Sequence, residues 1–253
     1  MKLYKAEAIV LRTRDCGNGD KLLVLYSREY GKIKAMAHGV AKPSSRKRGA
    51  VQPFTHTRFL LYRGRELDSV SQCEGVEMFS GLRGNLENIS YANYLAELVD
   101  ALTLEGEPNE ALFLLLLSTL RLLAEGDAEL LARAFEIRAA GFMGYHPVLE
   151  ACANCQGPVG GKLFFSPGQG GVLCEACAPA DADALSCNRG VLETMKTLLK
   201  WHPSRMGQLK VGRPARNQIK RLMLEYLRYH LERDLKTAAF LNRFAPGPPG
   251  LDE

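Results

Sequence analysis

Four of the seven cysteines fall into two pairs with the spacing of metal ligands. Cys152 and Cys155 form the first pair, Cys174 and Cys177 form the second, and 18 residues separate the two pairs. Each Cys-x2-Cys pair directs two thiolates to one side of a tight turn, so two pairs complete a tetrahedron around one zinc ion. Four sulfur ligands leave no open coordination position, which predicts a structural zinc ion and not a catalytic one. Reduced thiols without metal, or a redox-active pair, are the alternatives.

The segment that carries these cysteines, 145–187, is poor in core-forming residues. Glycine, proline, alanine and cysteine dominate it, and only 162–165 and 171–174 have the pattern of short strands. Such a segment buries too little apolar surface to fold alone, so a metal ion would take the place of a core. We therefore expect a zinc finger here.

Basic residues gather at the two ends of the chain and acidic residues in its middle. Residues 1–80 hold 15 basic and 8 acidic side chains, residues 81–150 hold 4 and 11, and residues 191–253 hold 12 and 6. This asymmetry suggests a polyanion as the partner of the basic ends. Ordinary solvated surface charge is the alternative.

The N-terminal cations lie on predicted strands and on a loop, 39–50, that is rich in proline, serine and glycine. Cations that follow a phosphate chain, with aromatic rings interleaved, are what a groove for single-stranded DNA requires. Most of the aromatic residues are better explained as core, and the charges could instead protect sheet edges from aggregation. The candidate DNA-binding residues of this region are Arg12, Arg14, Lys21, Lys32, Lys34, Lys42, Arg46, Lys47 and Arg48.

A second set of cations surrounds the start of the longest predicted helix, 214–235. Cations in a first helical turn oppose the helix dipole at a cost of roughly a few tenths of a kcal/mol each, so an anionic partner would explain their presence. Pairing with the acidic middle of the chain explains them equally well. The candidate DNA-binding residues of this set are Lys210, Arg213, Arg216, Lys220 and Arg221.

Signatures of catalysis are weak in this chain. Phosphate-binding glycine loops, metalloprotease helices and nucleophile elbows have no match, so we expect a protein that is not an enzyme. A metal-dependent nuclease that uses Asp15, Asp20 and Asp68 is a third-ranked alternative, since a glycine-rich turn already explains the first two.

Short strands predominate in the N-terminal third of the chain. Residues 7–12, 21–27, 32–38, 51–61 and 67–73 have strand composition or alternation, and polar turns separate them. Five short strands in this space predict a small antiparallel barrel of the OB-fold type. The fold class is therefore α+β, with an N-terminal OB-fold barrel followed by a helical part that holds the four-cysteine finger.

Apolar spacing changes to a helical period after residue 81. Helices are predicted near 89–102, over 110–124 and 128–142, and then over 189–201 and 214–235, on either side of the finger. We expect an OB-fold domain at 1–80, a helical domain at 81–144 and 188–243, the finger at 145–187, and a disordered tail at 244–253, which is rich in proline and glycine.

These elements come in an order that resembles the bacterial RecO family of DNA repair proteins over nearly the whole chain. Each matching motif is modest, but their order and spacing are specific. Besides the two cysteine pairs, the motifs lie at 7–12, 19–21, 31–33, 39–42, 52–54, 82–83, 144–147, 165–167 and 240–241.

The resemblance implies a recombination mediator that binds single- and double-stranded DNA and anneals complementary strands. It also implies loading of RecA, together with RecR and in some settings RecF, onto DNA coated by the single-stranded-DNA-binding protein. The helical domain would receive the acidic and hydrophobic C-terminal tail of that coating protein. The motifs do not fix which side chains do so.

A zinc-stabilised RNA-binding or scaffolding module is the runner-up interpretation. The chain has no run of about 18 apolar residues that would span a membrane, and its N-terminus lacks the apolar core of a signal peptide. We therefore expect a cytoplasmic, nucleoid-associated protein.

Overall fold

The computed structural model describes residues 2–241, so the tail predicted at 244–253 lies outside the described residues. Two compact units divide the described chain: residues 2–124 with 236–241, and residues 125–235. The barrel and its neighbouring helices make the first unit, and the cysteine-bearing segment belongs to the second. The finer division into an OB-fold domain, a helical domain and a finger stays a prediction.

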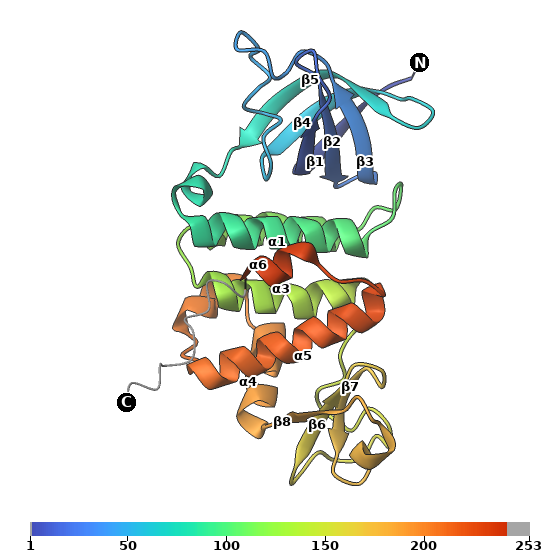
Figure 1. Cartoon of the computed structure of the whole chain (residues 1–253), viewed down its shortest axis with the longest axis vertical. Coiled ribbons are helices and arrows are strands. Elements are labelled where there is room, and N and C mark those ends of the chain that lie inside the picture. The colour runs from blue at the N-terminus through green and yellow to red at the C-terminus, as the bar shows by residue number, and fades with distance from the viewer. Residues whose placement is uncertain (1, 242–253) are drawn as a thin grey trace. The chain divides into compact units, whose positions relative to one another are not determined.

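Five strands close into a barrel at the start of the first unit (Figure 1). Their order is β1-β2-β3-β5-β4, and only the short pairing of β3 with β5 is parallel. This topology confirms the predicted OB-fold type and the α+β class. The strands are β1 (Leu3–Asp15), β2 (Lys21–Ser27), β3 (Gly31–Ala37), β4 (His56–Tyr62) and β5 (Asp68–Glu77).

Strand β3 shows why the sequence folds in this way. Ile33, Ala35 and Ala37 are buried in the barrel core, whereas Lys32 and Lys34 alternate with them and point outward. A period of two places one face of a strand on the core and the other toward its surroundings. The barrel therefore displays its lysines on its outer surface.

The predicted strand 51–61 is wrong at its start, because β4 begins only at His56. Proline at position 53 has no N–H to give to a strand ladder, and Phe54 adopts a left-handed conformation with φ of 69°. Residues 38–55 consequently form a series of turns between β3 and β4. We call these residues the turn segment.

Helices complete the first unit next to the barrel (Figure 1). Asn85 and Asn109 cap the N-termini of α1 and α2 through their side chains. The carboxylate of Glu97 on α1 accepts hydrogen bonds from the first backbone N–H groups of α6. The elements are η1 (Ser80–Gly84), α1 (Leu86–Leu102), α2 (Glu110–Leu123) and α6 (Lys236–Leu241).

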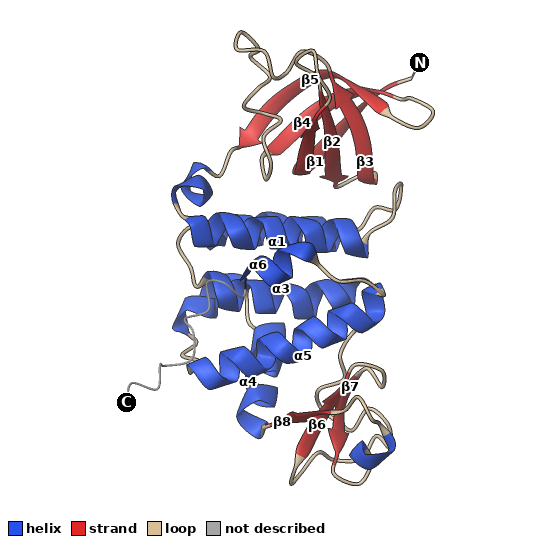
Figure 2. Ribbon diagram, in the orientation of Figure 1, coloured by secondary structure: helices blue, strands red, loops and turns tan. Residues whose placement is uncertain are grey.

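The second unit combines three helices with a small three-stranded sheet of order β7-β6-β8 (Figure 2). Helix α5 ends four residues before its predicted end, since Glu232 turns to a left-handed conformation with φ of 51°. The elements are α3 (Ala128–Phe142), β6 (Leu163–Ser166), β7 (Gly171–Cys174), η2 (Ala178–Ala180), β8 (Leu185–Cys187), α4 (Arg189–Lys200), η3 (Pro203–Gln208) and α5 (Arg213–Leu231).

Helices across residues 2–241 are too short or too polar to cross a lipid bilayer.

Candidate metal centre and nucleic-acid interface

The sulfur atoms of the four paired cysteines come together at one end of β7. The Sγ atoms of Cys152, Cys155, Cys174 and Cys177 all lie within 4.8 Å of one another, and those of Cys155 and Cys174 are 3.9 Å apart. Tetrahedral coordination with bonds of about 2.3 Å requires sulfur atoms about 3.8 Å apart. The cluster can therefore hold one metal ion.

Two tight turns bring these sulfurs together. In the first turn, the backbone N–H of Gln156 donates to the carbonyl of Cys152, and Gln156 has a φ of 59°. In the second, the N–H of Cys177 donates to the carbonyl of Cys174, the last residue of β7. The sequence spacing predicted this arrangement correctly.

Backbone N–H donors surround the sulfur of Cys152. Burial opposes its charged form, but backbone N–H donors from Cys155, Cys174 and Asn154 lower the pKa of Cys152 to about 6. A thiolate is the form of cysteine that binds metals. The apolar cluster around it is small, with only Cys152, Leu173 and Ala178 as its buried members among the described residues.

Two barrel cations that the sequence predicted to bind DNA, Arg12 and Lys32, form ion pairs with helix α1. Arg12 donates to Asp100 at 3.1 Å, and Lys32 donates to the Asp100 carboxylate at 3.0 Å and to its backbone carbonyl at 2.7 Å. Burial opposes the charge of Asp100, but Lys32 and Arg12 lower its pKa below the ordinary value. The Lys32 side chain is only 12% exposed.

Two more of the predicted cations have carboxylate partners in the first unit. Lys34 lies 2.5 Å from Glu105 in the α1–α2 connection, and Lys21 lies 3.3 Å from Asp15. Arg28, which was not among the predicted residues, pairs with Glu110 at the start of α2. Acidic residues after position 81 thus pair with four cations of the barrel: Arg12, Arg28, Lys32 and Lys34.

Three of the four cations of the turn segment are exposed to solvent. Lys42, Arg46 and Arg48 are exposed, and within residues 2–241 no carboxylate lies at ion-pair distance from them; the same holds for Arg14. Lys47 differs, because its Nζ donates to the carbonyl of Ser71 on β5 at 2.6 Å. Lys47 therefore fastens the segment to the barrel.

Asp20 fixes the start of the turn segment. Its carboxylate accepts a hydrogen bond from the N–H of Gly39 at 2.7 Å and lies 2.7 Å from Nδ1 of His38. The Gly39 N–H and then His38 lower the pKa of Asp20. Asp20 thus has a structural role beside Lys42, whose backbone N–H donates to the carbonyl of Gly39.

The carboxylates of the nuclease alternative do not converge on a metal site. Asp15 pairs with Lys21, Asp20 holds the turn segment, and Asp68 accepts from the hydroxyl of Tyr4 and the N–H of Gly64. In the part of the chain that the structure describes, the four cysteines are the group that could bind a metal through three or more side chains.

Two cations at the start of α5 pair with the acidic N-terminus of α3. Arg216 donates to both carboxylate oxygens of Asp127, at 2.9 and 2.5 Å, and to Glu129 at 3.2 Å. Arg213 donates to Glu129 at 3.0 Å. Of the two explanations for this basic set, the structure favours pairing with the acidic middle of the chain for these two residues.

The other three residues of this basic set, Lys210, Lys220 and Arg221, differ in their exposure to solvent. Lys220 is half-buried, and burial, followed by the charge of Arg133, lowers the pKa of Lys220. Lys210 and Arg221 are exposed, and among the described residues no carboxylate lies at ion-pair distance from either.

Sequence reasoning did not find a cationic and aromatic cavity of about 460 Å³ in the second unit. Arg138, Phe142, His146, Trp201 and His202 line it, and they come from α3, the turn after α3 and the end of α4. Arg138 is half-buried and donates to the carbonyl of Leu198 at 3.1 Å. Within residues 2–241, no carboxylate lies at ion-pair distance from Arg138. Trp201, the single tryptophan of the chain, is the sequence feature that could have indicated this cavity.

Two family models together match almost the whole described chain. The family model for the N-terminal part of recombination protein O matches residues 1–79, and the model for its C-terminal part matches residues 83–239. The chain belongs to the RecO family. The family resemblance drawn from the sequence motifs is thereby confirmed.

Relatives named DNA repair protein RecO match this RecO-family chain almost end to end. The protein from Pelotomaculum thermopropionicum is 64% identical over 250 residues, covering 99% of this chain and 98% of the relative. Those from Desulforamulus reducens and Desulforudis audaxviator are 45% and 40% identical and cover 96% of this chain, and 95% and 98% of the relatives.

Proposed function

We propose that this chain acts in DNA repair by binding single- and double-stranded DNA and annealing complementary strands, without catalysing bond chemistry. Family membership supports the role in repair. The exposed cations of the turn segment, Lys42, Arg46 and Arg48, support DNA binding, since nothing in the described chain neutralises them. Arg14, Lys210 and Arg221 are also exposed and have no carboxylate at ion-pair distance among the described residues.

Annealing is mainly an electrostatic problem, because two polyanions repel each other. Exposed cations that bind phosphates release condensed counterions from the DNA and leave the bases available for pairing. Arginines on turns can reach a flexible backbone, and their guanidinium groups bind phosphate oxygens in a bidentate manner. The family also supports a role in loading RecA, together with RecR and RecF.

The cavity of Arg138 and Trp201 suits the C-terminal tail of the single-stranded-DNA-binding protein. An acidic and hydrophobic tail would place an apolar side chain against Phe142 and Trp201 and a carboxylate against Arg138, whose half-buried charge has no acidic partner in residues 2–241. Arg205 lies over the Trp201 ring at 4.7 Å and adds positive charge to this side. We assign the tail to this cavity.

We also propose that the four cysteines bind one structural zinc ion. Their four-sulfur set and the 3.9 Å Sγ separation of Cys155 and Cys174 suit zinc. The ion would hold together a segment with few buried apolar residues, and so support the adjoining helices α3 and α4.

Neutralising the turn segment should weaken DNA binding. For the double variant Arg46→Gln/Arg48→Gln, we expect the log–log salt slope of single-strand affinity to fall by about 1.4, since each phosphate contact contributes about 0.7. Annealing of complementary labelled oligonucleotides should slow in parallel. Lys47 is left unchanged because it holds the segment on β5.

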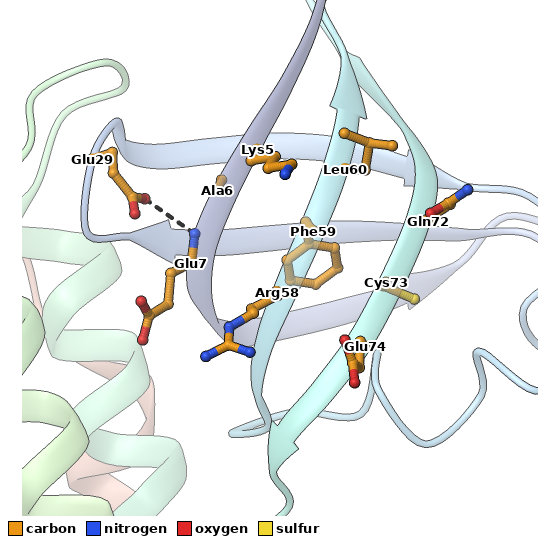
Figure 3. A pocket seen from close by; sticks show the side chains of 10 residues that line it. All are labelled: Lys5, Ala6, Glu7, Glu29, Arg58, Phe59, Leu60, Gln72, Cys73 and Glu74. Carbon is orange, nitrogen blue, oxygen red and sulfur yellow. Dashed lines mark hydrogen bonds between the residues drawn. The ribbon is translucent and has the colours of Figure 1, made fainter.

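Lys5 and Arg58, two exposed cations on the outer barrel face, provide the matched control (Figure 3). Glu7 on β1 and Glu74 on β5 stand in register with Arg58, so a phosphate that approached it would also meet two carboxylates. The variant Lys5→Gln/Arg58→Gln should keep the wild-type slope. An unchanged slope in the Arg46/Arg48 variant would contradict the role of the turn segment.

The tail assignment predicts that Arg138→Gln weakens binding of a peptide of the coating protein's tail by roughly tenfold, the effect of losing one charge-assisted hydrogen bond. Fluorescence anisotropy measures this affinity. The control Lys162→Gln removes an exposed cation of the same unit and should bind as the wild type does. Equal affinities for wild type and Arg138→Gln, with equal melting temperatures, would refute the assignment.

Elemental analysis tests the zinc proposal. The purified chain should carry one zinc ion, and Cys174→Ser should lose it and lower the melting temperature, because three sulfurs and a hydroxyl bind zinc poorly. A Cys174→Ser protein that retains one zinc ion per chain would overturn the ligand assignment. Cys187→Ser, which lies outside the cluster, should keep the metal.

A further inference from the structure

Helix α5 of the second unit (Figure 1) carries a row of alternating charges on the side opposite its buried residues. The row consists of Arg221, Glu225, Arg228 and Glu232, which follow one another at intervals of four, three and four residues. Side chains at these intervals share one side of a helix. We call these four residues the α5 stripe. The helix packs inward through Ile219, Leu222, Met223, Tyr226 and Leu227.

The α5 stripe is accessible to a large partner. Three of its four residues are exposed and Glu225 is half-buried. All four line a groove of about 610 Å³, whose other wall includes Pro167 and Leu185. Tyr229 lines the same groove, and its side chain is 55% exposed. The surface therefore combines a row of charges with an exposed aromatic ring.

The charges of the α5 stripe are mostly unused within the chain. Among residues 2–241, no oppositely charged group lies at ion-pair distance from Arg221, Glu225 or Glu232. Arg228 pairs through Nε with Asp234 at 3.1 Å, but its side chain stays 62% exposed. A guanidinium has five N–H donors, so the two terminal amino groups of Arg228 remain available to a partner.

Glu232 occupies a locally unfavourable position. It is the C-cap residue of α5 and adopts a left-handed conformation with φ of 51°, which favours glycine over residues with a Cβ. Its negative charge also stands at the negative end of the helix dipole. A cation from another molecule would compensate this charge.

The order of charges in the α5 stripe is complementary to itself when reversed. Two copies of α5 can lie antiparallel about a two-fold axis that passes between residues 226 and 227. Arg221 then faces Glu232 of the second copy, and Glu225 faces Arg228 of the second copy. Two-fold symmetry repeats each contact, so every charge of the stripe meets its opposite. A parallel pair in the same register would place like charges together.

The same alternation disfavours DNA as the partner of this surface. Binding of a phosphate chain requires cations that follow one another without intervening acids. A phosphate that approached Arg221 would lie near Glu225, and one that approached Arg228 would lie between Glu225 and Glu232. Another surface with the same alternation fits the stripe better.

We propose that the α5 stripe is the interface through which two copies of this chain associate as an antiparallel, two-fold symmetric dimer. Charged contacts dominate the interface, and Tyr229 adds apolar area beside them. The dimer should therefore be reversible and weaken as salt screens its ion pairs. A dimer carries two turn segments, one for each strand that the proposed annealing joins. That consequence rests on the proposed function, whereas the dimer itself does not.

Sedimentation equilibrium of the full chain tests the interface. The wild type should show a dimer fraction that rises with protein concentration and falls with salt. Glu225→Arg and Arg228→Glu should each weaken the dimer by roughly tenfold, because two ion pairs become two like-charge contacts. The control Glu193→Arg reverses an exposed charge on α4 and should dimerise as the wild type does.

Mixing the two single variants gives the sharpest comparison. In a mixed dimer of Glu225→Arg with Arg228→Glu, both central contacts again join opposite charges, so the equimolar mixture should dimerise as the wild type does. The double variant Glu225→Arg/Arg228→Glu should also recover the dimer. Circular dichroism should show equal helix content in all these proteins, since the substituted side chains lie outside the core.

Three results would overturn the proposed interface. The first is a wild-type chain that stays monomeric at low salt up to its solubility limit. The second is a dimer that Glu225→Arg and Arg228→Glu leave unchanged. The third is a failure of both the mixture and the double variant to recover the dimer. None of these measurements contains DNA, so a failure here leaves the proposed function to its own tests.

Discussion

Ion pairs between the acidic middle of this chain and its basic ends determine which cations can meet an external anion. Asp100 of α1 holds Arg12 and Lys32, and Asp127 of α3 holds Arg216. The carboxylate partners are partly buried, so a DNA phosphate could replace them only by leaving a charge without its counterion in a poorly solvated place. Cations paired in this way fix helices to neighbouring elements and are poor candidates for binding DNA.

Two connections between barrel strands carry several of the cations that this pairing leaves exposed. The turn segment after β3 presents Lys42, Arg46 and Arg48, and the β4–β5 loop presents Arg63 and Arg65. The core alternation of the barrel fixes the ends of both connections, while Asp20 and the Tyr4 ring position their first residues. A barrel with cations on its connections suits the proposed binding of flexible polyanions. The four-cysteine cluster belongs to the second unit, whereas both connections belong to the first.

The features that depend on local spacing were predictable from the sequence, and those that depend on tertiary partners were not. The cysteine cluster follows from two Cys-x2-Cys turns, and the barrel follows from alternation such as that of β3. The start of β4 was misplaced because apolar residues around Pro53 imitate a strand that proline prevents. The sequence could not show that Arg12 is paired and Arg46 is not, because Asp100, the partner of Arg12, lies 88 residues away in the chain. The Arg138 cavity was missed because residues far apart in sequence complete it.

One measurement tests most directly whether internal pairing selects the DNA-binding surface. The triple variant Arg12→Gln/Lys32→Gln/Asp100→Asn removes two cations together with the acid that holds them, so no unpaired charge remains. If the account is right, the salt slope of single-strand binding will equal that of the wild-type chain. A slope lower by about 1.4, the value for two lost phosphate contacts, would show that the paired cations do bind DNA and would contradict the account.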